Sequence, residues 1–188
     1  EYAQNIRKMG EEAWRVFNAG ALAVENMKDI SSQTDKENLF QSIGLTPKRR
    51  TVLMTYHPVT LDFSITPTEQ INNVFKALKT YEGQVLVTAP NVDEGGQEIN
   101  EAIKKYVDGK DIFYVESLGA KRYLGMLNFV DFVIGNSSSG LLEVPYFRIP
   151  TINIGKRQQG RIRHESVIDT GYSVDEIDDA IQKAKRTE

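Results

Sequence analysis

Short β-branched runs alternate with amphipathic, helix-like segments along most of this 188-residue chain. One helix-like segment starts at Thr66-Pro67, and Ile71, Val74 and Leu78 then recur at helical spacing. Strands that alternate with helices form βαβ units, so we predict an α/β fold with a doubly wound, mainly parallel sheet. The predicted strands are 51–56, 84–88, 111–115, 131–134 and 151–154. Further helices are predicted over 97–107, around 123–127 and over 174–184.

The first forty residues have a different pattern. They predict a helix over 2–12, a short strand over 15–18, a short helix over 22–27 and a polar, turn-rich linker over 29–37. We therefore expect residues 1–38 to end a preceding domain and residues 39–188 to form one doubly wound domain. The chain begins at Glu1 without a methionine, inside a predicted helix, so we expect a fragment of a longer protein.

A Gly/Ser-rich turn follows the fourth predicted strand, over residues 135–140. A strand that ends in such a turn and opens a helix gathers free backbone N–H groups and a positive helix end. The hydroxyls of Ser137 and Ser138 add donors, and the glycines allow close approach. Four cations follow soon after: Lys156, Arg157, Arg161 and Arg163. The pattern favours a phosphorylated ligand, and an ordinary serine-capped turn beside a solvated charged surface is the alternative.

Ligands of parallel α/β sheets bind outside the carboxyl ends of the strands. This rule selects the residues that directly follow the predicted strands. We therefore expect a single rim that carries His57, Asn91, Leu118, Ser137, Ser138 and Arg157.

Two further side chains near this rim have chemistry of their own. The imidazole of His57 titrates near neutral pH, so it can pair with a phosphate or move a proton, which makes it the candidate catalytic residue; a structural role is the alternative. Glu143 lies one helical turn after Ser139. A carboxylate there would repel phosphate, so we expect it to bind ribose hydroxyls, and a solvated helix acid is the alternative.

Composition excludes several classes of function. The formal net charge of −3 provides no general basic surface, so we expect no nucleic-acid partner. Without cysteine, disulfides and thiolate metal sites are excluded, which fits a reducing cytoplasm. No apolar run approaches the roughly 20 residues of a membrane span, so we expect no membrane partner. Metal-ligand spacings, a P-loop and a Gly-x-Gly-x-x-Gly motif are all absent, so we expect neither a metal nor a cofactor.

Residues 135–143 (GNSSSGLLE) and 150–161 (PTINIGKRQQGR) resemble the UDP-N-acetylglucosamine 2-epimerases. The segments 57–60 (HPVT) and 89–95 (APNVDEG) match that family in order and approximate spacing. These two segments are most similar to the hydrolysing branch, which makes N-acetylmannosamine for sialic acid and related nonulosonate synthesis. The non-hydrolysing branch usually carries an arginine-rich segment after the histidine, which this chain lacks.

The resemblance implies a fold of two Rossmann-like domains that face each other across a cleft, as in GT-B glycosyltransferases. This chain would be the second, UDP-binding domain of an enzyme that forms homo-oligomers when full length. His57, Ser137 and Ser138 would hold the diphosphate, and Asn91 would lie on the nucleotide side. The backbone around Leu118 would bind uracil, Glu143 the ribose hydroxyls, and Arg157 would complete the nucleotide contacts.

The family reaction implied by the resemblance starts with anti elimination of UDP from UDP-N-acetylglucosamine, which gives a 2-acetamidoglucal. Water then adds with inverted configuration at C2, and N-acetylmannosamine and UDP leave. The acid and base of the family lie in the first domain, so we expect this chain alone to be inactive. Two alternatives stay open: a non-hydrolysing epimerase, and a GT-B-type nucleotide-sugar-binding or glycosyltransferase domain.

Overall fold

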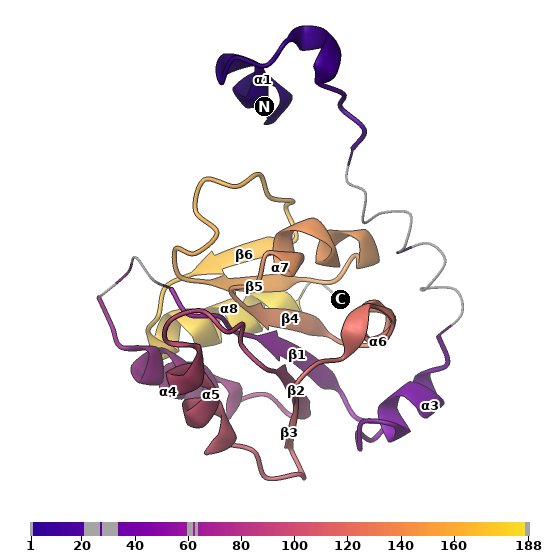
Figure 1. Ribbon diagram of the computed structural model, residues 1–188. Helices are drawn as coiled ribbons and strands as arrows, with labels where there is room; N and C mark the ends of the chain where they lie inside the picture. The colour runs from indigo at the N-terminus through magenta and orange to yellow at the C-terminus, as the bar shows by residue number, and fades with distance from the viewer. Residues whose placement is uncertain (1, 21–26, 28–33, 60–61, 63, 187–188) are drawn as a thin grey trace.

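A parallel six-stranded sheet forms the centre of the computed structural model, which describes residues 2–20, 27, 34–59, 62 and 64–186 (Figure 1). Its strands are β1 (Thr51–Thr55), β2 (Gln84–Thr88), β3 (Ile112–Val115), β4 (Phe132–Gly135), β5 (Thr151–Ile154) and β6 (Val167–Thr170). All neighbouring strands pair in parallel, in the order β3-β2-β1-β4-β5-β6. This is the doubly wound Rossmann order, and it confirms the predicted fold class.

Helices cover both faces of the sheet. They are α3 (Lys36–Gln41), α4 (Pro67–Leu78), α5 (Gly96–Lys104), α6 (Gly119–Met126), α7 (Ser139–Leu142), η2 (Val144–Phe147) and α8 (Val174–Lys185). Alternate residues of β1 point to opposite faces, so Val52 and Met54 pack with α4, α5 and α8, whereas Leu53 packs with α3 and α6. Figure 1 shows α4 and α5 on one side of the strands and α6 and α3 on the other. Both faces are therefore buried, as apolar parallel strands require.

The longer helices begin where the sequence predicts. Thr66 caps α4, and its side chain and that of Glu69 bond each other's backbone N–H groups in a capping box. Ser173 and Glu176 form the same arrangement at the start of α8. These caps satisfy backbone donors that a helix leaves free at its first turn.

The structure departs from the prediction at the N-terminal end and at the sheet edge. The first helix, α1, spans only Tyr2–Lys8, and the strand predicted over 15–18 is wrong: η1 (Ala13–Arg15) is followed by irregular backbone. A lone strand has no partner for its backbone groups. Most of the segments 22–27 and 29–37 lies outside the described residues, although α3 already begins at Lys36. The edge strand β6 is not predicted, because it is short and only half-buried.

Candidate functional site

The site lies where β1 and β4 end side by side, at the point where the strand order reverses. Thr55 pairs with Gly135 in the last register position of these strands. Gly135 has a φ of 140°, and a Cβ there would lie 1.9 Å from the Thr55 carbonyl oxygen, so only glycine fits. The Gly/Ser turn therefore leaves the sheet directly against the loop after β1. This is the position where doubly wound folds bind ligands.

Asn136 connects this turn to the neighbouring loops. It is 1% exposed, and its side-chain oxygen accepts from the His57 N–H at 2.7 Å while its side-chain NH₂ donates to the His57 carbonyl at 2.8 Å. Its own carbonyl accepts from Arg157 Nη1 at 3.2 Å and from Gln158 Nε2 at 2.7 Å. The loops after β1, β4 and β5 are thus joined at one residue.

The ring of His57 is held in one tautomer. Its Nδ1 accepts a hydrogen bond from the Asn91 N–H at 3.1 Å, so the neutral ring carries its proton on Nε2. Burial and the charge of Arg157 lower the pKa of His57 to about 4, against an opposing effect of Asp93. The expectation of titration near neutral pH is therefore wrong, because the half-buried ring is desolvated beside a cation. At pH 7 His57 is a neutral hydrogen-bond donor.

Arg157 lies at the edge of a hollow of about 420 Å³ between the loops after β1, β2 and β5. Burial lowers the pKa of its guanidinium, and the carboxylate of Asp93 acts in the opposite direction. Arginine keeps its charge under such shifts. The wall of this hollow is mixed in charge: Pro58, Val59, Asp62, Asp93, Lys156, Arg157 and Gln159. A phosphate there would meet two cations and two carboxylates.

The predicted cationic loop does not act as one group. Lys156 and Arg157 line the 420 Å³ hollow, whereas Arg161 is exposed. Arg163 turns back to the sheet, where it pairs with Asp169 and donates to the Gln158 carbonyl at 3.0 Å. Arg163 therefore supports the loop rather than the ligand side.

A second hollow of about 330 Å³ lies over the ends of β1, β2 and β3. Leu118 and Ser137 both line it, so the structure brings these two predicted residues together. At its base the hydroxyls of Thr55 and Thr88 are 2.7 Å apart. Residues of the loop after β3 and several hydroxyl side chains line this hollow together.

Glu143 is tied to the Gly/Ser turn by a chain of hydrogen bonds. The Ser139 hydroxyl donates to the Glu143 carboxylate, and the Tyr123 hydroxyl lies 2.6 Å from Ser139 Oγ. Because the serine hydrogen is used, Tyr123 donates to serine, and burial raises the pKa of Tyr123 to about 12. Glu143 is therefore held as a half-buried acceptor beside the second hollow, since Tyr123 lines that hollow.

Ser138 occupies the N-cap position of α7, but its side chain makes no capping bond. Helix α7 has only four residues, so the field at its N-terminus is weaker than that of a long helix. The half-buried hydroxyls of Ser137 and Ser138, rather than a helix dipole, are the main polar groups of the turn.

Sequence reasoning missed Asn136 and Gln158 as parts of this site. Both are about 1% exposed, and Gln158 holds the Asn136 carbonyl. Asn136 stood inside the quoted motif, and its place after the strand at the sheet's reversal point was the available signal. Nothing in the sequence pattern distinguishes Gln158 from the exposed Gln159.

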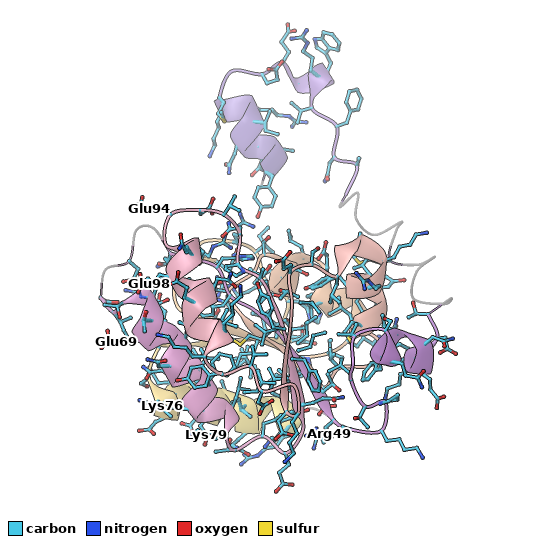
Figure 2. The ribbon with its side chains drawn as sticks, turned by 60° about the horizontal axis from the view of Figure 1, so that its bottom comes forward. Arg49, Glu69, Lys76, Lys79, Glu94 and Glu98 are labelled. Carbon is cyan, nitrogen blue, oxygen red and sulfur yellow. The ribbon has the colours of Figure 1, made fainter. Side chains whose placement is uncertain are left out.

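A further hollow, of about 510 Å³, lies at the other end of the sheet and carries no comparable chemistry. Arg49, which lines it, already pairs with Asp111 at 2.6 Å and donates to the Gly83 carbonyl at 2.7 Å. Figure 2 shows Arg49 and Lys79 at the end of the domain opposite Glu94, which belongs to the loop after β2. Strand ends at this side are not where doubly wound sheets bind ligands.

The described residues contain no helix that is long and apolar enough to cross a membrane. They also contain no group of three or more histidine or acidic side chains placed to hold a metal ion.

Comparison with known proteins identifies similar sequences. The profile of the family described as UDP-N-acetylglucosamine 2-epimerase matches residues 1–188. A Campylobacter jejuni relative, GDP/UDP-N,N'-diacetylbacillosamine 2-epimerase (hydrolyzing), is 35% identical over 100% of this chain and 48% of its own length. The Escherichia coli Polysialic acid biosynthesis protein P7 is 34% identical over 90% of this chain and 43% of its own length. The chain spans about half the length of the curated relatives it matches.

A solved structure has the same fold. The crystal structure of UDP-GlcNAc 2-epimerase from Neisseria meningitidis bound to UDP-GlcNAc superposes with a TM-score of 0.72 at 10% identity. The match covers 96% of this chain and 50% of that chain. The likeness at this identity is one of fold.

Proposed function

Because this chain belongs to the UDP-N-acetylglucosamine 2-epimerase family, we propose that it is the UDP-binding half of a hydrolysing 2-epimerase. The observation that carries the proposal is the Asn136 junction, which joins His57 and Arg157 at the sheet's reversal point. The name of the Campylobacter relative, which includes the word hydrolyzing, supports this branch. The name of the Escherichia coli relative supports a role in sialic acid or related nonulosonate synthesis.

We propose that UDP lies across both hollows of the rim. The uracil would occupy the 330 Å³ hollow against the backbone around Leu118, and Glu143 would accept from the ribose hydroxyls. Ser137, Ser138 and the His57 Nε2–H would donate to the diphosphate. Arg157 would supply the charge, at the edge of the 420 Å³ hollow. Asn91 would lie on the nucleotide side and hold the ring of His57.

This arrangement serves the departing group of an elimination. When the C1–O bond of the sugar breaks, its electron pair moves to the diphosphate, and a base takes the proton from C2. A fixed arginine and neutral N–H and O–H donors stabilise the charge that develops on the diphosphate. The acid and base at the sugar would come from the half of the enzyme outside this chain, so the chain alone would bind but not turn over.

Calorimetry with UDP tests the site. We expect saturable binding to this chain, and we expect Ser138→Ala and Arg157→Ala each to weaken it, the arginine change by roughly tenfold or more because a charge-assisted bond is lost. Arg49→Ala, at the other end of the sheet, is the control and should leave the affinity unchanged. Absent binding, or equal affinity in all variants, would contradict the proposal.

A second candidate is the non-hydrolysing epimerase, since the fold shared with the Neisseria UDP-GlcNAc 2-epimerase does not separate the two activities. The product separates the two activities. The full-length enzyme incubated with UDP-N-acetylglucosamine should release UDP and free sugar if it hydrolyses. A UDP-linked 2-epimer would reverse the choice.

We also propose that residues 1–38 end a preceding Rossmann-like domain, through which the full-length enzyme forms homo-oligomers. The exposed side chains of Met9, Trp14 and Phe17 support this, because a folded partner domain would cover them. Met27 is already buried with Phe40 in the core of the described domain. A cytoplasmic location is proposed from the cysteine-free composition.

A further inference from the structure

One buried residue joins its own loop, after β4, to the loops after β1 and β5 without lining either hollow of the rim. The side chain of Asn136 bonds both backbone groups of His57, and its carbonyl accepts from Arg157 and Gln158. Through the His57 ring the network also reaches the Asn91 N–H in the loop after β2. Four loops therefore share one junction.

We propose that Asn136 is the positioning residue of the diphosphate site: its hydrogen bonds hold His57 and Arg157 in the places from which they would contact the diphosphate. This inference rests on the proposed function, since it assigns a role within the same site. Asn136 is not a catalytic residue, because it acts through His57 and Arg157 rather than on the ligand.

The chemistry of the amide explains why asparagine suits this position. Backbone pairing between β1 and β4 ends at Thr55 and Gly135, and the Asn136 N–H still donates to the Thr55 carbonyl at 3.2 Å. Beyond that point the Asn136 side-chain amide continues the pairing. Its oxygen accepts from the His57 N–H, and its NH₂ group donates to the His57 carbonyl. Aspartate lacks the donor, and an apolar residue lacks both, which would leave half-buried backbone groups unpaired.

This junction orients the two side chains that are proposed to bind the diphosphate. With its backbone fixed by Asn136 and its Nδ1 fixed by Asn91, His57 has one direction left for its Nε2–H. One of the five N–H donors of Arg157 is used on the Asn136 carbonyl, which orients the guanidinium plane. Donors that are already fixed lose less conformational freedom on binding than mobile donors do. Their fixed position therefore favours binding of the diphosphate.

The test compares UDP with UMP by calorimetry on Asn136→Ala. Loss of the junction should weaken UDP binding by about tenfold or more and UMP binding by less than about threefold, so the preference for UDP over UMP should collapse. If Asn136 had a purely structural role, its loss would weaken the binding of UDP and of UMP by the same factor. The matched control is Asn72→Ala on α4, which also loses a side-chain bond, from the Tyr106 hydroxyl at 2.8 Å. It should keep the wild-type preference.

The outcomes separate the two proposals. Wild-type chain that binds no UDP overturns the proposed function and this inference with it. A folded variant that keeps the wild-type UDP/UMP ratio overturns the positioning role alone. If Asn136→Ala does not fold, Asn136→Ser repeats the comparison with a smaller loss of polar contacts. If neither folds, hydrogen exchange of the wild type decides: UDP should protect the His57 N–H more than UMP does, and equal protection overturns the role.

Discussion

At the scale of single residues, His57 shows how surroundings change the chemistry of a side chain. Histidine alone titrates near pH 6.5, which is why the sequence suggests a proton-transfer group. In the fold the ring is half-buried, accepts from the Asn91 N–H and faces the charge of Arg157. Each of these favours the neutral ring, so at neutral pH the ring is uncharged and can donate from Nε2–H.

NMR of the imidazole nitrogens should therefore find His57 neutral at pH 7, protonated on Nε2, and half-titrated near pH 4. Its folded pKa lies below the unfolded value of about 6.5, so the unfolded chain binds more protons between these values. The stability that His57 contributes is present above pH 6.5 and is lost as the pH falls toward 4. The free energy of unfolding, measured with denaturant, should fall less between pH 7 and pH 4.5 in His57→Gln than in wild type. Equal losses would contradict the assignment.

At the scale of elements, hydrogen bonds within the segment between β5 and β6 fix the position of Arg157. Arg163 pairs with Asp169 of β6 and donates to the Gln158 carbonyl, while the Gln158 side chain holds the Asn136 carbonyl. Asn153 of β5 donates to the same Asp169 carboxylate at 2.7 Å. The edge strand β6 thus anchors a loop that reaches the ligand side.

Arg163→Ala should weaken UDP binding by roughly threefold to tenfold, because the loop that carries Arg157 loses its anchor. Calorimetry measures the affinity, and thermal unfolding measures the stability. Arg49→Ala is a matched control, since Arg49 also pairs with one aspartate and donates to backbone carbonyls, but at the opposite end of the sheet. It should lower stability and leave UDP affinity unchanged. If Arg49→Ala weakened UDP binding and Arg163→Ala did not, Arg163 would not be the anchor of the loop that carries Arg157.

At the scale of the whole molecule, the sequence predicts what depends on local pattern. The five apolar strands and the α4 start follow from composition and spacing, and the strand-end rule brings His57, Asn91 and Arg157 to one rim. What it misses depends on distant partners. Strand β6 becomes a strand only because β5 offers its edge. The pKa of His57 depends on burial by the fold and on Arg157, a hundred positions later.

The division of labour between this chain and the rest of a full-length enzyme leads to the last prediction. In the proposed function the rim would supply donors for a departing diphosphate, whereas removal of the C2 proton needs a base at the sugar. The purified chain should therefore bind UDP yet release no UDP from UDP-N-acetylglucosamine above background, in a coupled assay for free UDP. The full-length enzyme should release it, and His57→Ala should reduce that rate. Turnover by the chain alone would contradict this prediction, because the acid and base at the sugar would then lie within this half.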